Sequence, residues 1–290
     1  MCSDPDSLDS LTWFLCYFTS GNHQSFYLSF LTVLGLMALA TPCILILGFA
    51  GALAKRSGIF FVRWFGQIYT SMVRSIPDII FFLFVPFAMD QGFEYVRHKV
   101  LCPESVEPVY QGSDFVVCTA AKLPLGPSPE WVHDMYGFIL ALIAYSIVFG
   151  AFAANVIDGA LKAVPKNQIE TASAYGFKKH QIFWRIHMPQ MWAYALPGLS
   201  NLWMILIKAT PLLFLLGVED IVYWARKLGS SKSQIYDFPH PNWLVWYFLA
   251  LLIFYLLFTA VSEVAFKRLT RRVSRGQASA AGAEGVGGKS

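Results

Sequence analysis

Charged residues are scarce in this chain. Only 14% of its 290 residues are Asp, Glu, Lys or Arg, whereas 56% are hydrophobic and the mean hydropathy is +0.50. A soluble domain needs a more polar surface than this composition provides. The formal charge of +4 at pH 7 calls for no nucleic acid as a partner, because most Lys and Arg residues stand in short segments beside apolar runs, as topology signals do. The composition indicates an all-α, polytopic membrane protein.

The chain also lacks a complete phosphate-binding loop. Gly288-Lys289-Ser290 ends like one, but the earlier glycine that the spacing requires is Ala283. We therefore expect no cofactor bound by this chain and no catalytic residues for ATP hydrolysis. ATP and Mg would be used by a partner ATPase, which would supply the energy.

Closely spaced cysteine pairs are missing as well. The five cysteines show none of the short spacings of a zinc or redox site, so no metal site is expected, and Cys43 is interpreted as a membrane-buried thiol. Cys102 and Cys118 fall in one expected external loop, where an oxidising compartment would permit a disulfide. The linked and the free form are both open at this point.

The chain contains several long apolar runs. Five of them reach the roughly 20 residues that a spanning helix needs. They are expected near residues 26–54, 65–89, 136–161, 192–217 and 243–266, the second being interrupted by Arg74 and Pro77. The first residues are acidic and the first run is long enough to span, so we expect it to be retained as an anchor and not cleaved as a signal peptide.

These runs give a domain layout. We expect an external N-terminal segment (1–25), a transmembrane domain (26–272) and a disordered cytoplasmic tail (273–290), which is rich in Ala, Gly and Ser. Within the transmembrane domain, residues 91–134 are expected to form a long external loop and residues 163–190 a cytoplasmic loop.

Basic residues fall on one side of the membrane if five helices alternate. That side is expected to be cytoplasmic, because short cytoplasmic loops carry an excess of Lys and Arg. The N-terminus would then be periplasmic and the C-terminus cytoplasmic. The basic residues are Lys55, Arg56, Arg63, Arg74, Lys162, Lys166, Lys178, Lys179, Arg185, Lys267, Arg268, Arg271, Arg272 and Arg275.

The stretch at residues 170–189 is polar and rich in small residues, although it stands between apolar runs. Pro165 suits the first turn of a helix and Gly176 suits a left-handed residue that ends it. Ile169, Ala172, Ser173 and Gly176 would then share a face that another surface can approach closely.

A second short helix is expected from Lys178 to about His187, with Ile182, Phe183 and Ile186 on one side, before Pro189 begins the next element. Two interpretations of the whole stretch are open on the residues alone. It is either an amphipathic connector whose Lys178, Lys179 and Arg185 touch anionic membrane lipid, or a surface on which a partner docks.

The run from Glu170 through Gly176 to Ile186 and Pro189 resembles the signature cytoplasmic loop of the permease subunits of bacterial ABC importers. An acid, small residues, a glycine and a terminal proline recur in that loop at this spacing. Other stretches resemble the polar amino acid branch, most closely the permeases for histidine, lysine, arginine and ornithine or for opines. These stretches are residues 73–78, 159–166, 195–198, 207–212 and 216–220, and the likeness covers about 28–272.

The resemblance implies a type I ABC importer permease fold in the bacterial inner membrane. It also implies a second permease subunit, identical or different, two cytoplasmic ATPase subunits and a periplasmic substrate-binding protein. The cargo would be an amino acid, with a basic amino acid or an opine as candidates. The residues carried over to the ATPase contact are Glu170, Ala172, Ser173, Gly176, Ile186 and Pro189.

Ionisable and polar residues inside expected spans are candidates for the translocation path, because they are expensive in a membrane. Arg74, Phe152, Asn155 and Lys208 are the candidates here. Three interpretations of Lys208 are open. Its side chain points into a water-filled translocation path, binds a backbone carbonyl where Pro211 disrupts the helix, or pairs with an acidic residue. The basic amino acid permeases commonly carry a tyrosine and a glutamate where this chain has Phe152 and Asn155, so a basic cargo is in doubt.

Two rival functions remain. An intramembrane enzyme would have to use Asp158, His187 or Lys208, which show no spacing of a nucleophile with a base. A secondary carrier that needs no ATP is disfavoured because the five expected spans show no internal repeat.

Overall fold

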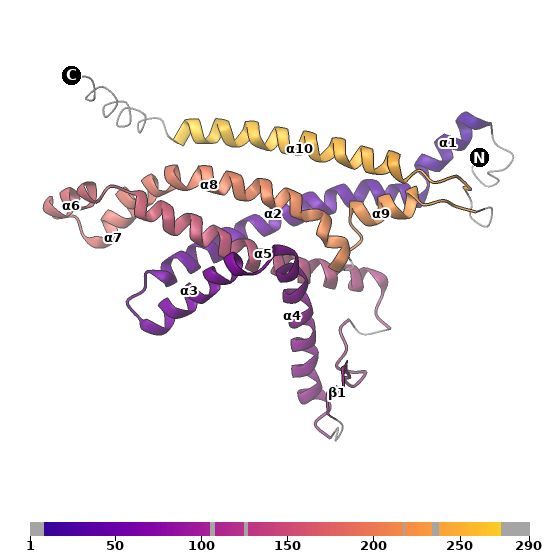
Figure 1. Cartoon of the computed structure of the whole chain (residues 1–290), viewed down its shortest axis with the longest axis horizontal. Coiled ribbons are helices and arrows are strands. Elements are labelled where there is room, and N and C mark those ends of the chain that lie inside the picture. The colour runs from indigo at the N-terminus through magenta and orange to yellow at the C-terminus, as the bar shows by residue number, and fades with distance from the viewer. Residues whose placement is uncertain (1–8, 105–107, 125–126, 217, 234–237, 274–290) are drawn as a thin grey trace. The chain divides into compact units, whose positions relative to one another are not determined.

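The structure is a computed structural model that describes residues 9–104, 108–124, 127–216, 218–233 and 238–273 (Figure 1). Five of its helices or helical runs are long and apolar enough to cross a membrane, which confirms the expected number. The candidate spans are Gly21–Lys55, Ile79–Leu101, Trp131–Ala163, Lys179–Phe214 and Leu244–Val273. They correspond to α2 (Gly21–Lys55), α4 (Asp78–Leu101), α5 (Glu130–Ala163), the run through α8 (Met188–Ala209), and α10 (Leu244–Val273).

The second expected span differs from the structure. Residues 65–89 are not one interrupted helix but parts of two, α3 (Phe60–Ser75) and α4, and the candidate span lies wholly in α4. Pro77 is the physical cause, because it lacks an N–H and disfavours helical geometry at the residue before it. Helix α4 also continues to Leu101, so residues 91–101 of the expected external loop are helical.

The remaining elements are short. Helix α1 lies inside the expected N-terminal segment, and the sequence pattern did not predict it. Of the expected tail at 273–290, Val273 is the last residue of α10 and residues 274–290 lie outside the described residues. These elements are α1 (Ser10–Thr19), β1 (Tyr110–Gln111), β2 (Asp114–Phe115), α6 (Lys166–Ala174), α7 (Lys179–Ile182), the π-helical η2 (Phe183–His187), the 3-10 helical η3 (Thr210–Leu216) and α9 (Ile221–Gly229).

The chain divides into two compact units. The first contains residues 1–43, 73–148 and 209–254. Its described part carries an antiparallel pairing of β1 with β2, in which Tyr110 stands opposite Phe115, and a buried aromatic cluster formed by α1, the start of α2 and the start of α10. Tyr145 of α5 is fully buried in this unit, and its hydroxyl donates a hydrogen bond to the carbonyl of Ala209 at 2.6 Å.

The second unit contains residues 44–72, 149–208 and 255–290. Small residues let α2 and α5 pack closely in it: a Cβ added at Gly48 would lie 2.7 Å from the Ala153 Cβ, and one at Gly51 would lie 2.9 Å from the Ala154 Cβ. Close approach through small residues is a common way for helices to associate in membranes.

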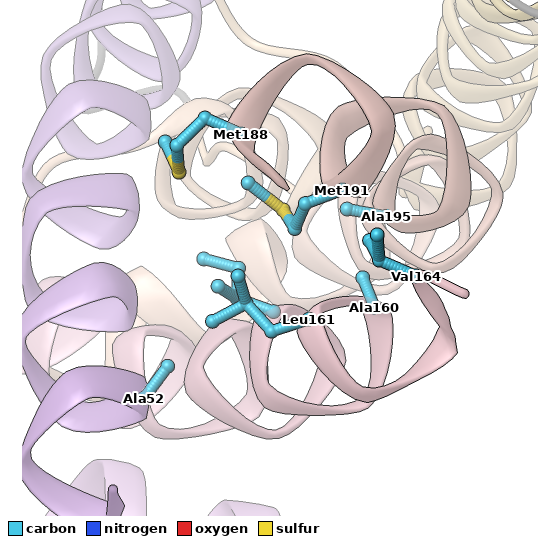
Figure 2. Close-up of a cluster of buried hydrophobic side chains, with 8 residues drawn as sticks. Ala52, Ala160, Leu161, Val164, Met188, Met191 and Ala195 are labelled. Atoms are coloured by element: carbon cyan, nitrogen blue, oxygen red, sulfur yellow. The ribbon is translucent and has the colours of Figure 1, made fainter. Parts of the chain in front are cut away.

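A buried apolar cluster continues from this contact toward α8. Figure 2 shows its side chains converging from α2, the end of α5 and the start of α8. The cluster consists of Ala52, Ile157, Ala160, Leu161, Val164, Met188, Met191 and Ala195. It fixes the ends of the two helices from which residues 163–190 emerge.

Candidate functional site

Helix α6 begins the 163–190 segment and ends at a glycine, as the sequence predicts. Pro165 is its N-cap and Tyr175 its C-cap, and Gly176 follows with φ +79°. The Gly176 N–H donates to the Ser173 carbonyl at 3.0 Å and the Phe177 N–H to the Ala172 carbonyl at 3.1 Å. This pair of bonds is the Schellman motif, which satisfies the last carbonyls of a helix and needs a left-handed residue at the glycine position.

The second half of the segment differs from the expected short helix that stops before Pro189. Helix α7 begins at Lys179, widens into the π-helical turn η2 and passes without a break into α8, in which Pro189 is the second residue. A proline has no N–H to offer the carbonyl four residues earlier. A π turn directly before Pro189 fits this defect, because its hydrogen bonds reach five residues back; the Met188 N–H donates to the Phe183 carbonyl.

The segment is held to both spans that flank it. His187 donates from Nε2 to the carbonyl of Leu161 at 2.9 Å, which ties η2 to the end of α5. Gln190 of α8 donates to the side-chain oxygen of Gln168 in α6. Ile169 packs against the buried cluster of Figure 2. A displacement of α6 would therefore act on α5 and α8 together.

The opposite side of the segment is exposed and partly aromatic. Glu170 and Ser173 are exposed, and so are Tyr175, with 80%, and Trp184, with 55% of the residue exposed. A hollow of about 370 Å³ opens beside Tyr175, and the buried Ala172 lies in its lining. The full lining is Asn167, Gln168, Thr171, Ala172, Tyr175, Phe177 and Ile186. The resemblance to the permease loop singled out Ala172 and Ile186. It did not single out Tyr175 and Trp184, although aromatic residues in a polar loop are visible in the sequence.

Asn155 belongs to a polar network between α2 and α5. Its Oδ1 accepts from the ammonium of Lys55 at 3.0 Å, and its Nδ2 donates to the carbonyl of Thr70 at 3.0 Å. The same ammonium lies 3.3 Å from the carboxylate of Asp158, which also accepts from Lys162 at 2.7 Å. The hydrogen bonds of Asn155 are thus made to the protein itself.

The other candidates for the translocation path lie apart from this network. Phe152 is half-buried, with its ring centroid 6.2 Å from that of Phe149. Lys208 lies in the last turn of α8, is exposed, and has no hydrogen bond or ion pair with any residue that the structure describes. The Arg74 side chain lies outside the described part of the chain. An acid paired with Lys208, one of its three interpretations, is absent from the described residues.

Two of the three residues that the enzyme rival requires have another role. Asp158 is ion-paired with Lys55 and Lys162, and His187 is bonded to a backbone carbonyl. A nucleophile activated by a base needs the two side chains within hydrogen-bond reach. Lys208 makes no such contact within the described ranges, so these residues do not form a catalytic set.

A small disulfide-closed module follows α4. Cys102 and Cys118 are joined, which settles the alternative left open above. One face of α4 holds the module: Arg97 donates to the carbonyls of Ala120 and Ala121, Cys118 donates its N–H to His98 Nδ1 at 3.1 Å, and Leu123 donates its N–H to Glu94 at 2.9 Å. The ring nitrogen of His98 and the sulfur atoms of Cys102 and Cys118 lie within 4.8 Å of one another, as the ligands of a metal ion do. The two sulfur atoms are, however, bonded to each other in the disulfide.

Comparison with known proteins supports one family over most of the chain. Residues 44–275 match the family model described as binding-protein-dependent transport system inner membrane component. The arginine ABC transporter permease protein ArtQ of Escherichia coli strain K12 is 32% identical over 74% of this chain and 80% of its own length. The histidine/lysine/arginine/ornithine transport system permease protein HisQ of Salmonella typhimurium is 30% identical over 80% of this chain and 85% of its own.

A third relative and a solved structure agree with this assignment. The octopine transport system permease protein OccQ of Rhizobium radiobacter is 29% identical over 80% of this chain and 83% of its own length. A chain in the crystal structure of an amino acid ABC transporter with histidines has the same fold, with a TM-score of 0.60 at 17% identity over 92% of this chain and 99% of that one. This chain therefore belongs to the family of inner-membrane permease components of binding-protein-dependent transport systems, and has the type I ABC importer fold.

Proposed function

We propose that this chain is a permease subunit that moves an amino acid into the bacterial cell, and that ATP hydrolysed by a separate ATPase drives it through the 163–190 segment. The amino acid cargo is inferred from the relatives, which are named for arginine, for histidine, lysine, arginine and ornithine, and for octopine. The hydrogen bonds of Asn155 within the protein support no particular charge on the cargo.

The observation that carries the proposal is the two-sided construction of this segment. Its inner side is bonded to α5 through His187 and to α8 by direct continuation, whereas Tyr175 is left exposed beside a hollow and Trp184 is exposed on η2. Large exposed aromatic residues around a concavity are typical of protein interfaces. Glu170 and Ser173 would lie at the rim of this contact, where an ATPase domain would seat α6.

Coupling follows from the stiffness of these connections. When two ATPase subunits close on ATP, a segment seated on them is displaced, and α5 and α8 are displaced with it. Such coupling requires an element with two discrete arrangements that both ATP and cargo favour differently. Gly48 and Gly51 of α2 pack closely against α5, so a movement of α5 would displace α2 as well. Close-packed interfaces transmit displacement because they contain little free volume.

The orientation proposed here places the segment inside and the disulfide module outside. Five candidate spans that alternate sides would put Cys102 and Cys118 on one face of the membrane and residues 163–190 on the other. Disulfides persist in oxidising compartments such as the periplasm and are rare in the cytosol. The Cys102–Cys118 module would then face the periplasm, where the substrate-binding protein approaches, and the N-terminus would lie on the same side.

A second permease subunit is proposed to complete the translocation path. Lys208 is exposed within a candidate span, and a charged side chain is costly against lipid. A neighbouring subunit or a water-filled path between two subunits would relieve that cost.

The test is co-purification and ATPase activity of the whole complex. We expect Trp184→Ser together with Tyr175→Ser to lower the amount of ATPase retained in mild detergent and to remove cargo-stimulated hydrolysis. Trp64→Ser is the matched control, because Trp64 and Trp184 are both 55% exposed but Trp64 lies on α3. Equal loss in both variants, or transport by this chain without any ATPase, would overturn the proposal.

A further inference from the structure

Helix α1 (Ser10–Thr19) has two unlike faces, and the inner one is fully committed to contacts within the first unit. Trp13 stacks on Tyr17 with ring centroids 5.2 Å apart, and both meet the ring of Phe238. The ring centroid of Tyr17 also lies 5.5 Å from that of Trp243, the residue before α10. This packing fixes the rotation of α1 about its own axis.

A directed chain of hydrogen bonds reinforces this fixation. Nδ1 of His240 lies 2.7 Å from the carbonyl of Pro241, and since a carbonyl can only accept, Nδ1 carries the proton of the neutral ring. Nε2 of His240 must then accept from the hydroxyl of Tyr17 at 3.2 Å. The hydroxyl of Tyr247 donates to Tyr17 at 3.0 Å, and Nε2 of His23 donates to Tyr247 at 2.7 Å. These hydrogen bonds, from His23 through Tyr247 and Tyr17 to His240, form a relay that joins α1, α2 and α10. The proton of each of the two hydroxyl groups has one assigned acceptor in it.

The outer face of α1 is apolar and exposed. Leu11, Phe14, Leu15 and Phe18, which recur at the spacing of one helical face, are 74%, 45%, 64% and 47% exposed. The ten residues of α1 include no charged side chain. Because the relay and the stacked rings hold the opposite face inward, α1 cannot turn this stripe toward the protein.

A groove that is also lined mainly by apolar and aromatic side chains lies beside the stripe and includes two of its residues, Phe14 and Phe18. It has a volume of about 510 Å³ and an aromatic lining. Its residues come from all three helices of the relay: Phe14 and Phe18 of α1; His23, Phe26 and Tyr27 at the start of α2; and Trp243, Trp246, Tyr247 and Ala250 at and after the start of α10.

We propose that α1 is an interfacial anchor: its stripe lies in the lipid of the leaflet in which α2 and α10 begin, and the groove holds a phospholipid acyl chain. Continuity with the membrane-facing surfaces carries the proposal. The exposed Phe14 and Phe18 of α1 share the groove with the exposed Tyr27 of α2 and Trp246 of α10, which joins the stripe to the surfaces of these two spans. Trp and Tyr concentrate where spans meet the headgroups, and a helix with one apolar face lies in the plane of the interface with that face toward the acyl chains.

Lipid fits this surface better than a soluble partner does. A partner that dissociates would return four large apolar side chains to water each time, and exposed stripes of this kind are costly in solution. Lipid is always present beside the first turns of α2 and α10. The anchor does not depend on ATPase coupling, so its failure would leave the proposed function intact.

The test is spin-label accessibility in the full chain, reconstituted in nanodiscs of phosphatidylethanolamine and phosphatidylglycerol. Labels are placed by Leu15→Cys on the stripe and by Asp9→Cys, an exposed polar control just before α1, both in a Cys43→Ser background because Cys43 is a free cysteine. We expect the ratio of collisions with oxygen to collisions with a water-soluble nickel chelate to be several-fold larger at position 15 than at position 9. Phe18→Cys repeats the measurement if Leu15→Cys does not fold.

Two results would overturn the proposal. An equal ratio at positions 15 and 9 would place the stripe in water. Low collision rates with both reagents at position 15 would show that protein covers it, as in contact with a second copy or a binding protein.

Discussion

The ammonium of Lys55, in the last turn of α2, lies 3.3 Å from the carboxylate of Asp158 in α5, and only 5% of that carboxylate's side chain is exposed. The pair joins two helices that are about 100 residues apart in sequence, at the end of the bundle from which the 163–190 segment emerges. Removing one member of a buried pair is costly because the other charge is left without a partner.

We therefore expect Asp158→Asn to lower the stability of the detergent-purified protein by about 3 kcal/mol, the lower end of the range for buried pairs because Lys55 is partly exposed. Thermal unfolding would measure this loss. Glu263→Gln is the matched control: it breaks an exposed pair with Lys267 on α10, which should be worth about 0.5 kcal/mol or less. Equal losses in the two variants would contradict the importance of burial, and adding Lys55→Met to Asp158→Asn should restore part of the stability.

Replacement of Gly176 tests the turn that follows α6. A Cβ at this position would meet nothing within 4 Å, so a substitution is opposed by the backbone conformation alone. A left-handed β-branched residue costs about 1–2 kcal/mol, whereas asparagine tolerates this region. We expect Gly176→Val to abolish cargo-stimulated ATPase activity and uptake in proteoliposomes, and Gly176→Asn to keep a substantial part of both. Similar activity of the two variants would show that the left-handed conformation is not required.

The disulfide makes a prediction about sides of the membrane. Cys102 and Cys118 should react with a membrane-impermeant maleimide in intact spheroplasts only after an impermeant reductant has been added. Loss of the bond through Cys102→Ser and Cys118→Ser should cost about 3 kcal/mol of local stability, the value expected for a loop of this size, seen as faster hydrogen exchange at residues 109–121. Labelling without reduction, or only after the membrane is opened, would contradict the proposed orientation.

Asp220 gives the protein a pH dependence outside its spans. Its carboxylate caps α9 by accepting from the N–H groups of Val222 and Tyr223 at 3.1 and 2.9 Å. Burial raises the pKa of Asp220 from 3.8 to about 7. The folded state thus favours the protonated form, and the stability it contributes is fully present below pH 3.8 and lost as the pH rises through about 7.

Between about pH 5 and pH 8, the melting temperature of the wild-type protein should therefore fall relative to that of Asp220→Asn. The asparagine keeps an oxygen for the cap, so the comparison isolates the charge of the carboxylate at position 220. Parallel melting curves across this range would refute the assignment.

Local rules predicted a good part of this structure. Five spans followed from hydropathy, and the left-handed Gly176 followed from the capping pattern of α6. The end of the second span was placed too early: residues 91–101 were expected in the external loop but continue α4. The acidic residues near this point have partners distant in sequence, since Asp90 accepts from Tyr136 and Glu94 accepts from the Leu123 N–H. A polar residue whose partner is distant in sequence cannot be told from a solvated one.

Long-range contacts are what the sequence could not show. The relay joins His23 to Tyr247 across 224 positions, and no periodicity reveals such a pair. Asn155 stays a candidate for the translocation path, and its hydrogen bond with Lys55, a hundred residues away, could not be seen in the sequence. The Cys102–Cys118 pairing was left open because sequence alone does not place two thiols within bonding distance.

The π-helical turn at Phe183–His187 has a consequence for how such proteins diverge. A π turn holds one residue more than the α turn it replaces. Deleting a single residue there would restore a regular helix and leave α7 nearly in phase with α8, because the wider turn already accommodates the additional residue. A residue can therefore be gained or lost at this point while the exposed side of α7 keeps its direction relative to the span that follows.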